Sequence, residues 1–194
     1  MTQLRVLTGA ALDAALDDVA RLRIAVFRDW PYLYDGDPAY EAAYLESYRN
    51  SDRAILVGAF DGTRLIGAAT GTPLEDHAEE FRAVAAALPV PLARIFYCAE
   101  SVLLPAYRGR GIGHAFFDRR ERFARAQGFD HALFCAVRRP DDHPLRPAGY
   151  RPFDGFWRKR GYAPVAGAEA WLEWQDIDRP EATEKPLQVW MRAL

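Results

Sequence analysis

The sequence has little that would support a metal, redox or membrane role. Its 194 residues include only two cysteines, Cys98 and Cys135, and both lie in apolar runs, which is typical of buried reduced thiols. The four histidines show no ligand spacing with one another or with the cysteines, so no structural metal is expected. No apolar run reaches about 18 residues, and the N-terminus does not resemble a secretion signal. We therefore expect a cytoplasmic protein with no membrane partner.

Strong charge of one sign is missing as well. The chain carries 25 Lys and Arg against 27 Asp and Glu, a formal net charge of -2. The global basic field that dominates nucleic-acid binding is absent, so no nucleic-acid partner is expected. Half of the residues are hydrophobic and 27% are charged, which is typical of a globular protein. With this length and no repeat or linker, we expect one domain over residues 1–194.

Hydrophobic periodicity divides the chain into helical and extended segments. It predicts helices at 10–28, 40–48, 78–87, 111–127 and 153–160. Alternation and apolar runs predict strands at 4–7, 54–60, 64–70, 94–104, 131–137, 168–177 and 187–193. The segment 29–38 is rich in aromatic and acidic residues and contains two prolines, so we expect an irregular loop there.

A glycine-rich turn links the strand at 94–104 to the helix at 111–127. Glycines at 109, 111 and 113 let the backbone adopt left-handed conformations and let a ligand approach closely. The free N–H groups and the positive dipole end of the helix then favour a diphosphate. The spacing is not Gly-x-Gly-x-x-Gly, and no Gly-Lys-Ser/Thr occurs, so dinucleotide and nucleoside triphosphate sites are not indicated. A purely structural turn would carry similar glycines.

The turn also carries a more specific pattern. Arg108, Gly111 and Gly113 fit the pattern Gln/Arg-x-x-Gly-x-Gly/Ala, between an apolar strand end and a helix. In this context the segment resembles the acyl-CoA signature of the GNAT acetyltransferase superfamily, and the order of predicted elements is similar over almost the whole chain. The run from Cys98 to Pro105 resembles an uncharacterised bacterial branch, which indicates no substrate.

The resemblance implies a single-domain α/β fold. It would have a mixed, mostly antiparallel sheet of six or seven strands, helices on both faces, and a central pair of strands, ending at Leu104 and Val137, that splay apart. Acetyl-CoA or another short acyl-CoA would lie in that gap. The backbone of Val102, Leu103 and Leu104 would hold the pantetheine arm and the thioester oxygen. The pyrophosphate would bind at Arg108, Gly109, Arg110, Gly111, Ile112, Gly113 and His114.

Glu100 is the candidate base, because an alkylammonium must lose a proton before it can attack a thioester. It is the only carboxylate in the predicted strand 94–104, on the face that also carries Phe96, Cys98, Val102 and Leu104. The alternative is a structural ion pair. The sequence offers Arg120 as the partner, because Arg120 lies on the apolar stripe of the following helix.

The acid that protonates the departing thiolate is less clear in the sequence. Members of the superfamily often have a tyrosine four residues before the Gly-aromatic pair after the last helix, which here is Gly161-Tyr162. That position is Trp157, whose indole cannot act as the acid. Tyr150, in the preceding loop, is the candidate substitute, with unassisted departure and an ordinary loop tyrosine as alternatives.

Two regions are candidates for acceptor binding. The loop at 29–38 carries Trp30, Tyr32, Tyr34, Asp35 and Asp37, of which Tyr32, Tyr34 and Asp35 are the chosen substrate residues, because rings and carboxylates can surround a cation. The same residues could instead pack the loop onto the core. The three arginines after the strand at 131–137 offer an anion site for an acidic substrate or the cofactor's 3'-phosphate: Arg138, Arg139 and Arg146. The sequence leaves both readings open.

The expected function is N-acetyltransfer, or transfer of a short acyl group, from acyl-CoA to a primary amine of a small molecule or peptide by direct attack on the thioester. The alternative is an acyl-CoA-binding sensor or interaction module without turnover, which the tryptophan at 157 keeps open. The acceptor amine and the choice between monomer and homodimer stay open.

Overall fold

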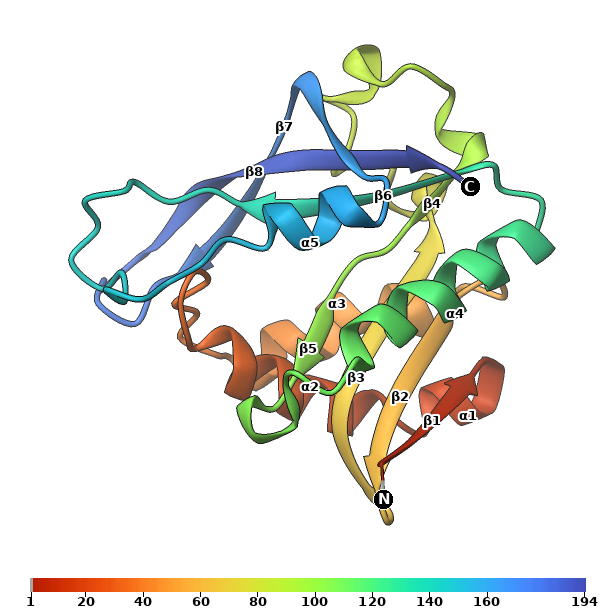
Figure 1. Cartoon of the computed structure of the whole chain (residues 1–194), viewed down its shortest axis with the longest axis horizontal. Coiled ribbons are helices and arrows are strands. Elements are labelled where there is room, and N and C mark those ends of the chain that lie inside the picture. The colour runs from red at the N-terminus through yellow and green to blue at the C-terminus, as the bar shows by residue number, and fades with distance from the viewer. Residues whose placement is uncertain (1) are drawn as a thin grey trace.

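The polypeptide forms one twisted sheet with helices on both sides (Figure 1). The structure is a computed structural model that describes residues 2–194. The strands are β1 (Thr2–Leu7), β2 (Ile55–Asp61), β3 (Arg64–Pro73), β4 (Ile95–Tyr97), β5 (Ser101–Leu103), β6 (His131–Val137), β7 (Ala163–Gln175) and β8 (Ala182–Ala193). The helices are α1 (Gly9–Asp13), α2 (Leu16–Phe27), α3 (Pro38–Arg49), α4 (Ile112–Ala126) and α5 (Asp154–Lys159), with short 3-10 turns η1 (Leu74–His77), η2 (Ala85–Ala87), η3 (Leu92–Arg94) and η4 (Pro105–Tyr107).

The sheet is mixed and mostly antiparallel, as the resemblance implies. Its order is β1-β2-β3-β4-β6-β8-β7, and β5 pairs with β3 beside β4. Only β4 and β6 run parallel among the paired strands that the structure describes. The described residues form eight strands instead of the expected six or seven, because the predicted strand at 94–104 is broken into β4 and β5.

The break at residues 98–100 reverses the faces of the strand. Phe96 and Cys98 belong to the apolar cluster on the α4 side, whereas Val102 belongs to the cluster on the opposite side. Glu100 also lies on that opposite side, in contact with Arg23 of α2. A single unbroken strand would have put all four side chains on one face, so the predicted alternation was wrong from residue 100 onward. An extra residue in one strand of a pair has this effect on side-chain direction.

Two apolar clusters, one on each face, hold the helices to the sheet. The helices α4 and α5 cover one face with a cluster that includes Phe116, Phe117 and Trp157. The helices α1, α2 and α3 cover the other face, where Val19 and Tyr48 are buried (Figure 1). The expected helices on both faces are therefore confirmed.

Two predicted helices differ in the structure. The helix expected at 10–28 is interrupted after Asp13 and continues as α2 from Leu16. The helix expected at 78–87 does not form; turns closed mainly by i→i+3 hydrogen bonds replace it, between η1 and η2. A segment of this length is marginal as an isolated helix, so tertiary contacts decide its form. Here the turns bury Phe81 and Val84.

The C-terminal hairpin and the start of α3 are longer than predicted. The strands β7 and β8 pair antiparallel, with an irregularity between Pro164 and Glu169. The helix α3 starts at Pro38, where Asp37 accepts hydrogen bonds from the backbone N–H groups of Ala39 and Tyr40. An aspartate before a proline is a favoured start for a helix.

Across the described part of the chain, no helix combines the length and the apolar character that a membrane span requires.

Candidate active site

A cavity opens where β5 and β6 separate. Backbone pairing between β4 and β6 runs from Ile95 with His131 to Tyr97 with Leu133, and the N–H of Cys98 donates to the carbonyl of Leu133 at 2.7 Å. Beyond this point β5 pairs only with β3, while β6 stays paired with β8. The expected splay is therefore confirmed. The resulting cavity has a volume of about 950 Å³.

The glycine turn forms one wall of this cavity. Gly109 and Gly111 have φ values of 76° and 78°, the left-handed region where a side chain is strained. Both line the cavity, and no atom lies within 4 Å of the place where a Cβ would be. Gly111 is the N-cap of α4, so the free N–H groups of the first helical turn lie at this wall. This is the geometry that favours an anion.

The predicted cofactor residues around the turn fall into two groups. Arg108, Ile112, Gly113 and His114 line the cavity. Arg108 is exposed, and its Nε donates to the carbonyl of Leu103 at 3.2 Å. Arg110 is absent from the cavity lining; its Nη2 donates to the carbonyl of Ala106 at 2.8 Å and its guanidinium lies over the Tyr107 ring.

Successive residues of β5 direct their backbone N–H and C=O groups alternately toward β3 and toward the gap between β5 and β6. Leu104 donates its N–H to the carbonyl of Ile66 at 3.0 Å, and the carbonyl of Glu100 accepts from Thr70 at 3.2 Å. Val102 lies between these two in the same register. In an antiparallel pair, the residues between hydrogen-bonded positions direct their backbone groups away. The backbone of Ser101 and Leu103 therefore faces the gap, whereas that of Val102 and Leu104 faces β3.

Glu100 is buried, and its two oxygens have different surroundings. Its Oε2 lies 2.9 Å from Nη1 of Arg23 and accepts a hydrogen bond from the Tyr44 hydroxyl at 3.0 Å. Its Oε1 is buried without a hydrogen-bond partner. A carboxylate oxygen in this state can accept a proton or a hydrogen bond from a ligand.

Arg120 is not the partner of the Glu100 carboxylate, so the predicted partner was wrong, although Glu100 does form a buried ion pair, with Arg23. The Arg120 guanidinium donates to the backbone carbonyls of Thr70 and Glu100, both at 3.0 Å, and to Oγ of Ser101 at 2.8 Å. The strand break explains the difference, because it directs the Glu100 side chain toward α2 and away from α4. Arg120 instead supports the break from the opposite face.

A second, smaller pocket begins at Glu100. Its volume is about 70 Å³. It is mostly aromatic, with Phe27, Tyr32, Tyr34, Tyr40, Tyr44, Tyr97 and Trp174 in its lining, together with Arg23, Ala99, Glu100, Cys135, Leu172 and Leu187. The residues that line both this pocket and the large cavity are Phe27, Tyr32, Ala99, Glu100 and Cys135. The two spaces therefore meet along these residues, with Glu100 among them.

The three predicted substrate residues are not equivalent in the structure. Tyr32 and Tyr34 line the small pocket, and burial raises the pKa of each hydroxyl to about 12. The Tyr34 hydroxyl accepts a hydrogen bond from the N–H of Asp37 at 3.2 Å. Asp35 lines neither the pocket nor the large cavity; it is exposed and lies 3.1 Å from Nη1 of Arg28. Asp35 thus forms an ion pair with Arg28 at the surface.

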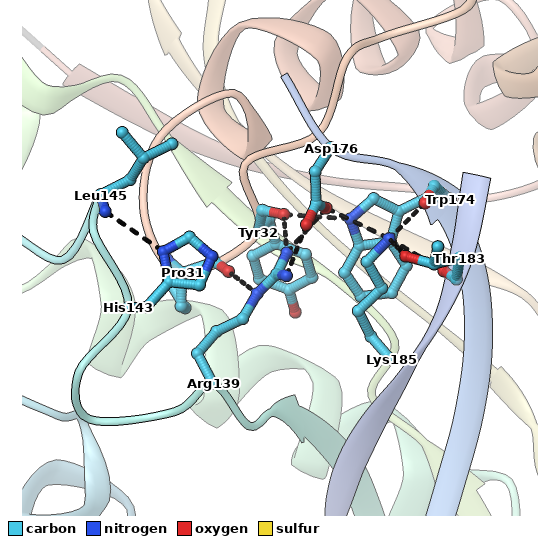
Figure 2. A network of polar contacts seen from close by, with 9 residues as sticks. All are labelled: Pro31, Tyr32, Arg139, His143, Leu145, Trp174, Asp176, Thr183 and Lys185. Atoms are coloured by element: carbon cyan, nitrogen blue, oxygen red, sulfur yellow. Dashed lines mark hydrogen bonds and ion pairs between the residues drawn. The ribbon is translucent and has the colours of Figure 1, made fainter. Parts of the chain in front are cut away.

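A buried ion network fixes the loop that carries Tyr32 (Figure 2). Arg139 donates to the carbonyls of Pro31 and Tyr32 at 2.8 and 2.5 Å and to both carboxylate oxygens of Asp176 at 2.6 and 2.9 Å. Lys185 lies 3.2 Å from Asp176. Burial alone would raise the pKa of Asp176. The hydrogen bonds and charge of Arg139, followed by those of Lys185, lower it by more than burial raises it, so the pKa lies below its ordinary value. Arg139 therefore has its donors committed within the protein.

The other two arginines of the proposed anion site make fewer contacts within the protein than Arg139 does. Both Arg138 and Arg146 line the large cavity. Arg138 lies 3.6 Å from Glu169 and its side chain is largely exposed, while Arg146 pairs with Asp141.

Aromatic side chains form the wall of the large cavity opposite the turn. Tyr150 lines it half-buried, with its ring edge-on to Trp30 at a centroid distance of 5.8 Å. Burial raises the pKa of the Tyr150 hydroxyl. Trp157 also lines the cavity and packs against Phe134 and Trp190 at centroid distances of 5.0 and 5.1 Å.

Sequence reasoning missed three residues beside Glu100. Arg23, Glu41 and Tyr44 come from α2 and α3, and only their packing brings them to the strand break. One signal was available: Arg23 lies one turn after Val19 and one turn before Phe27, on the apolar stripe of its helix. A charge in such a stripe needs a buried partner.

The cysteines and possible ligand clusters add no further chemistry. Cys98 and Cys135 are both buried and free. Within residues 2–194, no group of three or more His, Cys, Asp or Glu side chains is arranged to hold a metal ion.

The splayed sheet and the glycine turn at a helix N-terminus are the features that the resemblance to the GNAT superfamily implies. Residues 19–148 match the family model described as Acetyltransferase (GNAT) family. The match covers more than half of the chain, and the protein belongs to this family.

Solved structures with the same fold extend over the whole chain. An N-acetyltransferase from Staphylococcus aureus Mu50 is 12% identical, with a TM-score of 0.61, covering 100% of this chain and 98% of its own. A ribosomal-protein-alanine N-acetyltransferase from Brucella melitensis is 16% identical, with a TM-score of 0.61 and 99% of both chains covered. A PaiA N-acetyltransferase from Thermoplasma acidophilum, in complex with coenzyme A, is 14% identical, with a TM-score of 0.53 and coverage of 100% and 99%. At these identities the likeness shows the fold alone. No curated protein matches the sequence.

Proposed function

We propose that this protein is an acyl-CoA-dependent N-acyltransferase that transfers an acetyl or other short acyl group to a primary amine. The observation that carries the proposal is the place of Glu100, a buried acidic residue that lines both the large cavity and the aromatic pocket. A thioester in the first space and an amine in the second would meet beside this side chain. Membership of the GNAT family supports the same reaction class.

The residues around the large cavity fit an acyl-CoA. The turn at Gly109 and Gly111 offers open backbone and helix N–H groups for the pyrophosphate, with the exposed Arg108 beside it. The gap beyond Cys98 leaves room for the pantetheine arm, along the backbone of Ser101 and Leu103. A backbone N–H on this side would stabilise the negative charge that develops on the thioester oxygen.

Glu100 would take the proton of the attacking amine. Its Oε1 is available, whereas its Oε2 is held by Arg23 and Tyr44. The ammonium N–H bond breaks as the Glu100 O–H bond forms, and the neutral amine then attacks the thioester carbon. The C–N bond forms and the C–S bond breaks without a covalent bond to the protein; the nitrogen loses its second proton to water as the amide forms, and the departing CoA thiolate takes up one proton.

Tyr150 would return a proton to the departing thiolate. Because burial raises its pKa, the hydroxyl keeps its proton at neutral pH and can act as a donor. The usual tyrosine position is held by Trp157, whose ring packs into the cavity wall and supplies no acid.

The second candidate function, an acyl-CoA-binding sensor without turnover, is favoured by Trp157 alone. A screen of primary amines with acetyl-CoA separates the two functions through the release of free CoA. Turnover with any amine excludes the sensor. Tight acetyl-CoA binding without CoA release across small amines and peptide amines would contradict the enzyme.

A further inference from the structure

The wall of the aromatic pocket includes one buried cation, Arg23, which pairs with two buried carboxylates: Glu100, which also lines the pocket, and Glu41, which does not. Arg23 donates its Nε to Oε2 of Glu41 at 2.5 Å, and its Nη1 lies 2.9 Å from Oε2 of Glu100. The side chains of Arg23, Glu41 and Glu100 are only 9%, 0% and 3% exposed, so water screens their charges little. One positive charge is therefore shared by two negative ones.

The other titratable groups that line the pocket do not cancel this excess. Burial raises the pKa of Tyr32 and Tyr34 to about 12, and it also raises the pKa of the remaining tyrosine hydroxyls and the thiol, so all are neutral at pH 7: Tyr40, Tyr44, Tyr97 and Cys135. Arg139 and Lys185 contact the Trp174 ring but do not line the pocket. The negative excess therefore belongs to the buried cluster of Arg23, Glu41 and Glu100, of which only Arg23 and Glu100 line the pocket.

The Glu41 carboxyl responds to this excess. Burial is the largest cause that raises its pKa, Arg23 opposes the rise, and the neighbouring Glu100 charge adds to it. A cation placed beside Glu100 would relieve the repulsion between the two carboxylates. An anion placed there would increase it, because Arg23 is already engaged by both.

The shape of the pocket limits the body of the ligand. About 70 Å³ is space for only a few heavy atoms beyond the junction at Glu100. The rings of Phe27, Tyr40 and Trp174 form much of the wall. Such faces attract a cation and pack against an apolar carbon chain.

We propose, on the basis of the proposed function, that this pocket selects a small cationic monoamine and rejects acceptors with a carboxylate beside the amino group. Glu41 acts as a positioning residue. Because Arg23 pairs with both Glu41 and Glu100, it neutralises the negative charge of Glu100 only in part, and the remaining charge can attract the ammonium and receive its proton. After that transfer the cluster holds one cation and one carboxylate and is neutral. An α-amino acid would bring its own carboxylate against Glu100, whose partner Arg23 is already shared with Glu41.

Matched pairs of amines and amino acids test the proposal in the wild-type protein. The pairs are ethylamine with alanine, isobutylamine with valine, and phenethylamine with phenylalanine, each differing only by the carboxylate. Calorimetric binding in the presence of CoA and CoA release from acetyl-CoA are measured for each. We expect kcat/KM to be about 100-fold higher, and binding correspondingly tighter, for the best amine than for its amino acid. Equal or stronger binding of the amino acids would overturn the proposal, as would binding by none of the amines.

The two readouts separate this proposal from the proposed function. Amine binding without CoA release with any acceptor would contradict the enzyme and support the pocket. CoA release that favours amino acids would support the enzyme and contradict the pocket.

Glu41→Gln tests the role given to Glu41. With one carboxylate neutralised, we expect the preference for amine over amino acid to fall by about tenfold. The control is Glu46→Gln, an exposed change on the same helix, which should keep the preference of the wild type. A ratio unchanged in a folded Glu41→Gln protein would contradict the positioning role, because a purely structural residue would lower stability without changing this ratio.

Discussion

The glycine turn and the aromatic pocket are built in different ways. The turn is seven consecutive residues, 108–114, whose function depends on backbone groups and on left-handed conformations at Gly109 and Gly111. The pocket takes side chains from α2, the loop after it, α3, the strand break, β6 and the hairpin of β7 and β8. If the proposed function holds, the cofactor is recognised by a local motif, whereas the acceptor is recognised by a tertiary arrangement.

The largest effect is expected at the junction of the two regions. Glu100→Gln should lower the rate by about 100- to 10,000-fold, as loss of a general base does, with acyl-CoA affinity nearly unchanged. Stability should fall little, because Arg23 keeps Glu41 as its partner. Steady-state kinetics, calorimetry and melting temperature on one preparation measure all three.

Glu121→Gln is the matched control for this change. Glu121 is also buried and paired with arginines, Arg160 and Arg192, but it lines neither cavity. Its substitution should lower stability and leave turnover intact. A Glu100→Gln protein that retains wild-type turnover would remove Glu100 from the mechanism.

The next effect in size is expected at the buried ion network that holds the loop of the aromatic pocket. Asp176→Asn leaves Arg139 and Lys185 buried without their carboxylate, so the free energy of unfolding should fall by about 3 to 5 kcal/mol. The loop at Pro31 and Tyr32 loses its fixed anchor, and KM for the amine should rise more than KM for acetyl-CoA. The exposed Asp178→Asn is the control, and a similar loss from it would contradict the role of the network.

The stability difference between the wild type and Asp176→Asn should depend on pH. Because the folded pKa of Asp176 is below its ordinary value, its ionised form adds stability above about pH 4, and this contribution is lost as the pH falls through the folded pKa. The gap in unfolding free energy between wild type and Asp176→Asn should therefore narrow on acidification. Denaturant unfolding at several pH values measures it, and a gap that widens would show the opposite sign.

The turn is tested by adding a side chain to it. Gly111→Val should weaken acyl-CoA binding by more than about tenfold, because the side chain projects from a backbone that must contact the pyrophosphate. Strain at φ 78° also costs about 1 to 2 kcal/mol of stability. Gly128→Val controls for strain, since Gly128 has a φ of 86° and lies outside the cavity. Equal affinity in both variants would argue against a cofactor role for the turn.

The smallest effect is expected at Tyr150. Tyr150→Phe keeps the edge contact with Trp30 and removes only the hydroxyl, so kcat should fall by about tenfold if that hydroxyl protonates the thiolate. Acetyl-CoA affinity and melting temperature should not change. Because a better leaving group needs no acid, the loss should shrink with an acyl donor whose thiol is more acidic, and an equal loss with both donors would contradict this role.

The turn and the positions of the strands along the chain were predicted well, because both depend on local patterns. Glycine spacing, the apolar strand at 131–137 and the helix from Ile112 are readable from consecutive residues. The seven predicted strands all formed, and only the interruption at 98–100 raised the number to eight. Alternation alone does not reveal that interruption, since Ala99 and Glu100 fit a continuous strand equally well.

The sequence predicted the pocket only in part, because its members depend on packing. Tyr32 and Tyr34 were found through their unusual loop, but Asp35 in the same loop faces solvent. Arg120 was chosen as the partner of Glu100, whereas the reversal of faces at the break gives that place to Arg23. A partner chosen from a helical wheel carries no information on which side of the sheet a neighbouring side chain lies.

The most direct measurement is a crystal structure with CoA and an unreactive analogue of an accepted amine bound together. The account predicts the CoA sulfur in the gap between β5 and β6, and the amine nitrogen within hydrogen-bond distance of Oε1 of Glu100. A sulfur in the gap with the amine bound away from Glu100, on the surface or beside Arg138 and Arg146, would contradict it.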